Sequence, residues 1–311
     1  MKNGNEATFE SHRAAVRARL LQADRLRAGP GSVSWKINRE VIVIASWGRA
    51  ILLQLAHPAV AAGVCHHSGF RGSLLTSFRR MQSTLGAMLS ITFGDTEQMI
   101  ATAARINTIH DHVHGRVSSS SHEATGATYS AHDTDLQRWV HATLLESVSL
   151  TYELLVGPLS GRERDRYCAE AAIMEPLLGM PARSLPRDSA QLAVYMRQML
   201  ASGNLVVTDT SRSLARAVLY PPRWYMVWPA FRPVQLLTLG LLPPSIRDAY
   251  GFEWRARDAR AFARWAMLLR KSLRLLPPIA REWPIARRRL SAAAETAAKP
   301  RLTCVHMGSR R

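Results

Sequence analysis

The chain has 311 residues, of which 47% are hydrophobic and 21% are charged, so it contains enough apolar sequence to bury a sizeable core. This composition excludes a disordered or low-complexity protein. The 41 Lys and Arg residues outnumber the 23 Asp and Glu residues, and the resulting net charge of +18 favours an anionic partner such as a nucleic acid or an acidic membrane surface.

The N-terminal segment, residues 1–36, is expected to be helical or flexible, and its first 31 residues contain no apolar signal-peptide core. The three cysteines, Cys65, Cys168 and Cys304, are scattered and form neither a disulfide framework nor a CxxC metal pair. Both features predict a cytoplasmic protein, because the cytoplasm keeps thiols reduced.

An apolar stretch, residues 41–65, is long enough to span a bilayer, but it contains Arg49, Gln54 and His57, followed by Pro58. An Arg at the centre of a bilayer costs about 2.5–3.5 kcal/mol on insertion scales. We therefore predict a buried core helix that is kinked or broken at Pro58.

The next helix carries polar residues on an apolar face, because Arg80, Thr84, Met88 and Ile91 recur at steps of three and four residues. An Arg and a Thr in this setting would suit the distal side of a cofactor pocket, where a donor polarises bound dioxygen. Alternatively, Arg80 is paired within the core and Thr84 bonds its own helix.

A further predicted helix places His110 on the same apolar face as Ile106, Ile109, Val113 and Val117. A neutral, inward imidazole is a natural ligand for iron or zinc, oriented by an acceptor on its other nitrogen. The alternative is a hydrogen-bonded core histidine without a metal.

Other histidines bear on this choice. The four-residue spacing of His110 and His114 would allow zinc chelation, but no Glu completes an HExxH motif. His57 lies in a very apolar sequence, and His141 lies on a predicted helix that starts near Asp133. Each of these histidines alone is best explained as a structural residue. Three inward histidines on three helices favour a cofactor site, because such sites in helical proteins are built from facing helices.

Helix-breaking residues punctuate a chain that reads as helical almost throughout. Gly94-Asp95 and Gly157-Pro158 predict helix ends, and residues 118–128 predict a polar loop. No alternating strand pattern is found, so we predict an all-α fold. The expected organisation is one domain over residues 37–290, followed by a disordered basic tail over residues 291–311.

The Arg-rich run from residue 255 to 289 alternates with large apolar side chains and predicts an amphipathic helix with a basic face. Such a helix is either solvated or lies on a membrane surface.

No nucleic-acid reader motif is present, so no nucleic-acid partner is expected. P-loop, GxGxxG and GxSxG motifs are also absent, and no sequence feature specifies an oligomeric state.

A string of motifs runs from Arg39 to Arg288. It includes Arg39-Glu40, Arg49-Ala-Ile-Leu-Leu-Gln-Leu-Ala-His57-Pro58, Phe93-Gly94-Asp95, His110 with Val113 and Gly115, Tyr129-Ser-Ala, Trp139-Val-His141-Ala-Thr-Leu, Gly157-Pro-Leu-Ser and Tyr250-Gly251 with Trp254. This string resembles the MpaB-type oxygenases, a family that includes the latex-clearing proteins that cleave rubber. It covers nearly the whole chain.

The resemblance implies an all-α, globin-like domain that holds haem b in its helical core. By this likeness His110 matches the proximal iron ligand, and His141 matches a histidine near the haem. Arg80 and Thr84 match distal-pocket residues of the rubber oxygenases. Since no CxxCH motif is present, the haem would be bound noncovalently.

His57 and Met88 are also counted as cofactor-binding residues, because their surroundings are apolar. The chain departs from the rubber oxygenases at Ser83, where those enzymes carry a lysine that can cap the iron. They also carry an export signal, which is not found here. Both departures favour a smaller substrate over a polymer.

These features predict a haem b-dependent oxygenase that uses O2 to oxidise an apolar small molecule, either an isoprenoid, a lipid or an aromatic compound. Peripheral contact with a membrane would be compatible with this function. The alternative is a non-enzymatic basic helical protein that binds a membrane surface or a partner. A third hypothesis is a non-haem metal hydrolase that uses His110 and His114.

Overall fold

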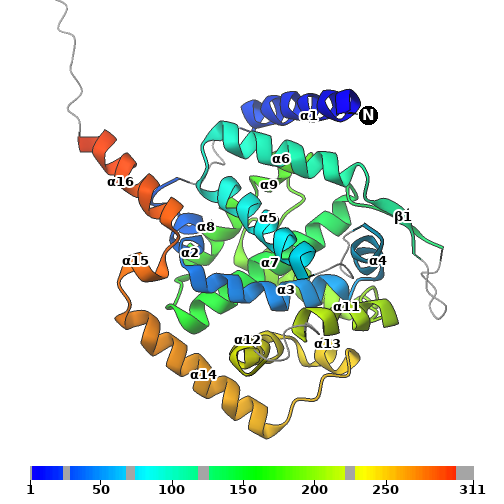
Figure 1. The fold of residues 1–311 in the computed structure, drawn as a ribbon, viewed down its shortest axis with the longest axis vertical. Coiled ribbons are helices and arrows are strands. Elements are labelled where there is room, and N and C mark those ends of the chain that lie inside the picture. Colours follow the sequence, from blue (N-terminus) through cyan, green and yellow to red (C-terminus); the bar gives the residue numbers. More distant parts are fainter. Residues whose placement is uncertain (1, 24–28, 68–73, 118–125, 221–227, 299–311) are drawn as a thin grey trace, which may run out of the picture.

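The computed structural model describes residues 2–23, 29–67, 74–117, 126–220 and 228–298, and gives the side chains of all of these except 2–5, 74–81, 228–230 and 292–298. The fold is all-α, as the sequence predicts. Helix α1 lies along α6 at one side of the molecule, and α14 lies at the opposite side (Figure 1). The globin-like arrangement and the domain boundaries stay predictions.

The elements in chain order are α1 (Lys2–Gln22), α2 (Val33–Asn38), the 3-10 helix η1 (Val41–Ala45), α3 (Ser46–Leu55), α4 (Pro58–His67), α5 (Leu74–Phe93), α6 (Thr96–His110), β1 (His114–Arg116), β2 (Thr128–Ser130), α7 (Thr134–Leu155), α8 (Gly161–Ala171), α9 (Met174–Leu178), α10 (Ser189–Ala201), α11 (Asp209–Leu219), α12 (Trp228–Leu241), α13 (Pro244–Ala249), α14 (Ala256–Leu275), α15 (Pro278–Arg281) and α16 (Pro284–Ala298).

Helix α7 is the centre of the core. Asp133 caps its N-terminus by accepting hydrogen bonds from the backbone N–H groups of Asp135 and Leu136, at 2.8 and 3.2 Å. Trp139 is fully buried and belongs to the same apolar cluster as Leu52 of α3. Because burying one large apolar side chain stabilises a fold by roughly 1.5–3 kcal/mol, this packing fixes α7 against α3.

The apolar stretch 41–65 forms η1, α3 and α4 rather than one helix. A bend of 109° separates Val41–Leu55 from Pro58–His67, so the predicted break at Pro58 is confirmed. Among the described residues, no single helix is long and apolar enough to cross a membrane. This bent pair meets that test only when its halves are counted together, by length and composition.

Arg49 is 3% exposed, and each nitrogen of its guanidinium donates one hydrogen bond. It donates to Glu146 Oε2 at 2.6 Å, to Ser147 Oγ at 2.7 Å and to the carbonyl oxygen of Leu241 at 2.8 Å. A buried cation is tolerated only with such partners. Arg49 therefore ties α3 to α7 and to the end of α12.

A short hairpin follows α6. Strands β1 and β2 pair antiparallel, and Gly115 faces Tyr129 in their register. A Cβ at Gly115 would lie 2.9 Å from the Tyr129 hydroxyl oxygen, which leaves no room for a side chain. The prediction that Val113 and Val117 continue the helix of His110 is wrong, because the chain turns after His110 and enters this hairpin.

The C-terminal third consists of α12 to α16. The sequence pairs Pro221-Pro222, Pro243-Pro244 and Pro277-Pro278 predict breaks between helices in this part of the chain. Pro244 and Pro278 each begin a helix. The boundary predicted at residue 290 falls inside α16, whose alanine-rich end favours helix. Residues 299–311 lie outside the described part of the chain, as do most of the predicted loop 118–128 and Pro221-Pro222.

Candidate functional site

A cavity of about 580 Å³ lies among α3, α4, α5, α6, the hairpin and α7. Its wall is mainly apolar and includes Val60, Leu136 and Val140. The exposed side chains of Thr84 and Ile109 belong to the same wall, so the cavity reaches the surface between α5 and the end of α6. Its size lies within the range of about 300–1,000 Å³ that is usual for small-molecule and cofactor sites.

His110, the last residue of α6, lines this cavity. Burial and the neighbouring His132 lower the pKa of His110 to about 4, although the carboxylate of Asp111 acts in the opposite direction. Its Nδ1 is buried and has no hydrogen-bond partner in the described structure. His110 is therefore a neutral imidazole at pH 7, and a neutral imidazole has a nitrogen lone pair that can bind a metal ion.

His141 on α7 lines the same cavity. Burial, with a smaller contribution from His110, lowers its pKa to about 4. No hydrogen bond joins its ring to any residue that the structure describes. The structure thus brings two of the three predicted inward histidines to one cavity, from α6 and α7.

A cluster of two histidines and a carboxylate lies next to His110 at the end of α6, and no sequence pattern described above indicated it. The rings of His110 and His132 meet edge to face, with centroids 5.7 Å apart. Asp111 accepts hydrogen bonds from His132 Nε2 at 2.8 Å and from His12 Nε2 of α1 at 2.7 Å. The sequence feature that could have pointed to His132 is its position directly after the Tyr129-Ser-Ala motif. This cluster fixes the end of α6.

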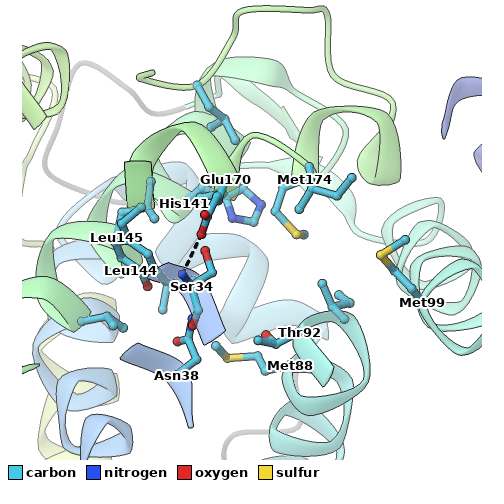
Figure 2. A pocket seen from close by; sticks show the side chains of 16 residues that line it. Ser34, Asn38, Met88, Thr92, Met99, His141, Leu144, Leu145, Glu170 and Met174 are labelled. Carbon is cyan, nitrogen blue, oxygen red and sulfur yellow. Dashed lines mark hydrogen bonds between the residues drawn. The ribbon is translucent and has the colours of Figure 1, made fainter. Parts of the chain in front are cut away.

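A smaller cavity of about 160 Å³ lies next to the larger one, and His141 lines both. Figure 2 shows His141, Glu170 and Met174 on one side of it, with Met88 and Thr92 on the other. Met88 therefore faces the smaller cavity, while Thr84, one turn earlier on α5, lines the larger one.

The remaining predicted residues lie elsewhere. Arg80 belongs to α5, but its side chain is outside the described residues. His57 follows α3 and lines neither of the two cavities. Burial lowers its pKa, with an opposing effect of Asp133, and its Nδ1 is buried with no hydrogen-bond partner in the described structure. Ser83 joins Thr84 on the wall of the larger cavity.

The zinc pair that spacing allowed is not formed on a helix, because α6 ends at His110 and His114 lies exposed on β1. Across the described ranges, no group of three or more His, Cys, Asp or Glu residues is placed to hold a metal ion. Nothing in the described geometry therefore favours the hydrolase hypothesis.

Residues 35–271 match the family described as ER-bound oxygenase mpaB/B'/Rubber oxygenase, catalytic domain. This match covers well over half of the chain. The chain belongs to this family. Its membership of the mpaB/rubber oxygenase family confirms the resemblance that the motif string indicated, and it identifies the domain as an oxygenase catalytic domain.

Relatives of this oxygenase domain occur in mycobacteria. An uncharacterised protein of Mycobacterium bovis and an uncharacterised protein of Mycobacterium tuberculosis are each 27% identical to it over 233 residues, which is 73% of this chain and 87% of the relative. No solved structure matches the chain.

The residues around the larger cavity fit the haem that the resemblance implies. The wall is apolar, and the volume is sufficient for a cofactor. His110 is neutral, as an iron-ligating imidazole must be, and carries a buried Nδ1 without a partner. One histidine with one further neutral histidine nearby suits a noncovalent haem better than a metal held by several side chains.

Proposed function

We propose that this protein is a haem b-dependent oxygenase that acts with O2 on an apolar small molecule of the isoprenoid, lipid or aromatic class. The observation that carries the proposal is that two neutral imidazoles, His110 and His141, face one largely apolar cavity. Membership of an oxygenase family supports the same reaction class.

His110 would hold the iron, since its low pKa keeps a lone pair available at neutral pH. His141 offers one hydrogen bond to a ligand in the cavity, and Val60, Leu136 and Val140 exclude water around it. When bound, haem supplies the redox chemistry that activates dioxygen.

Thr84 places a hydroxyl group on the wall of the cavity, from α5. Arg80 precedes it by one helical turn, so the two residues belong to the same face of α5. Their proposed role is to donate hydrogen bonds to a polarised oxygen, which a low-dielectric site strengthens.

The proposal is tested by adding haem to purified protein and recording the absorption spectrum and the oxygen uptake with apolar substrates. A Soret band is expected for the wild type and for His112→Gly, whose side chain is exposed outside the cavity. The band should be weak or shifted in His110→Gly and should recover when free imidazole is added. Haem binding that is identical in all three proteins would remove His110 from the proposed role.

A peripheral membrane contact of a cytoplasmic protein belongs to the same proposal, and the outward face of α14 favours it. Phe262, Ala266 and Leu269 pack the inner face of α14 against the core. Asp258, the one acidic residue of α14, pairs with Arg232. The outward residues, all exposed, are Arg257, Arg260, Arg264, Met267, Leu268, Lys271, Arg274 and Leu275.

This outward face combines cations with large apolar side chains, which suits an anionic lipid surface. Leu268 is 52% exposed and Leu275 is 86% exposed. We expect sedimentation with vesicles that contain phosphatidylserine, and a loss of binding in Leu268→Gln/Leu275→Gln. Leu21→Gln, which removes an exposed leucine on α1 at the other side of the molecule, is the matched control. Equal sedimentation of all three proteins would contradict the contact.

A further inference from the structure

The smaller cavity has the properties of a second ligand site. We infer that it binds an apolar group of about the size of benzene, and that this group is the terminal part of a substrate whose reacting part lies in the larger cavity. The assignment to a substrate rests on the proposed function, whereas the binding of the apolar group does not.

The size of the cavity supports this inference. Its volume is about 160 Å³. An engineered protein cavity of about 150 Å³ with an aliphatic and aromatic lining stays dry and binds benzene or xenon. Three of the lining residues, Met88, Met99 and Met174, carry flexible thioethers, which adapt to ligand shape and make favourable contacts with aromatic rings.

Two polar side chains of the wall, those of Glu170 and Asn38, are already engaged within the protein. Glu170 accepts hydrogen bonds from the backbone N–H of Ser34 at 2.6 Å and from Arg166 Nε at 3.0 Å. Asn38 donates to the carbonyl oxygen of Ser34 at 2.9 Å. Figure 2 shows Glu170 turned toward Ser34 at the edge of the cavity. These two side chains offer little to water inside the cavity, and the ring of His141 lies at its boundary with the larger cavity, so an apolar ligand would displace water from the rest of the space at little cost.

The two cavities follow one another between the same pair of helices. On α7, Val140 lines only the larger cavity, Leu144 lines only the smaller one, and His141 lines both. On α5 the order is the same, because Thr84 lines the larger cavity and Met88 the smaller one. A single elongated molecule could therefore occupy both cavities past the ring of His141, which indicates a chain-like or arylalkyl substrate.

The test uses haem-free protein labelled at its methionine methyl groups, with benzene and xenon as probes in NMR titrations. The methyl signals of Met88, Met99 and Met174 should shift and saturate. Met196, buried in another part of the core, should not move. Shifts that do not saturate, or that spread over all methionines, would overturn the site.

Two variants on one helix sharpen the test. Leu144→Phe fills the cavity and should weaken benzene binding by at least about tenfold, because its ring takes up the space that benzene needs. Leu150→Phe, at a position 37% exposed on the same helix, should change the affinity by less than about twofold. If Leu144→Phe does not fold, Ala171→Leu replaces it as the filling variant. Equal affinity in the wild type and the filling variant would refute the location.

An alkylbenzene tests the link between the two cavities. In protein labelled also at its leucine and valine methyl groups, it should shift the signals of Leu136 and Val140, which line only the larger cavity, together with those of the three methionines. Shifts confined to the methionines would overturn the shared substrate while leaving the benzene site in place. Because no haem is present, either result is independent of whether the protein binds haem.

Discussion

Acid should destabilise the haem-free protein through His110 and His141. Both have a pKa of about 4 in the folded protein, against a usual value of 6.5. The unfolded chain therefore binds more protons than the folded chain between these two values, so the free energy of unfolding falls as the pH drops from 6.5 towards 4. Each lowering corresponds to about 3 kcal/mol. Their joint effect is smaller than twice that figure, because part of the shift in His141 is repulsion from His110.

The assay is urea denaturation of the haem-free protein between pH 7.5 and 4.5. The wild type should lose several kcal/mol over this interval, whereas His141→Gln should lose about 2 kcal/mol less, since its side chain takes up no proton there. His112→Gln, at an exposed position, should follow the wild type. Parallel curves for the wild type and His141→Gln would refute the burial of an uncharged imidazole at His141.

Three substitutions test the packing that positions the site. Arg49→Met should lower the free energy of unfolding by about 3 kcal/mol in urea denaturation, because it leaves Glu146 without its buried partner; a loss below 1 kcal/mol would contradict the role of this pair. Gly48→Ala should cost about 1–3 kcal/mol in the same measurement, since its Cβ would lie 2.2 Å from Thr238 Oγ1. Gly86→Ala on α5, where a Cβ meets nothing within 4 Å, should instead raise stability by about 0.5–1 kcal/mol. Equal melting temperatures for the two glycine variants would show that α3 and α12 do not pack as described.

The sequence predicted helix ends well where the determinant is local. Asp95 forms a capping box with Gln98 at the start of α6, directly after the predicted break at Gly94. Asp133 caps α7 through its side chain alone, which accepts from the backbone N–H groups of Asp135 and Leu136. Such signals depend on residues within one turn of each other, so they can be read from the sequence without tertiary information.

The face of α7 shows where periodicity stops being informative. Leu136, Val140, Leu144 and Val148 recur at steps of four residues, a period that predicts one apolar helix face, and all four line cavities. An apolar period identifies a face turned away from water, but it does not separate a packed face from the wall of a pocket. For the same reason, the sequence could not decide whether His141 is packed in the core or lines a pocket.

The end of α6 could not be predicted from spacing. Ile106, Ile109 and Val113 continue a helical period, yet the chain leaves the helix after His110 and forms the hairpin, in which Gly115 packs against Tyr129. The contact of His132 with His110 likewise joins residues that are distant in sequence. Such contacts depend on the tertiary fold, which a local pattern does not encode.

Haem content per chain, measured as the pyridine haemochrome after expression with a haem precursor, tests the role of His110 most directly. About one haem per chain is expected in the wild type and in His57→Ala, whose side chain lines neither cavity, and little or none in a folded His110→Ala. Full haem content in His110→Ala, or none in any of the three proteins, would contradict this role.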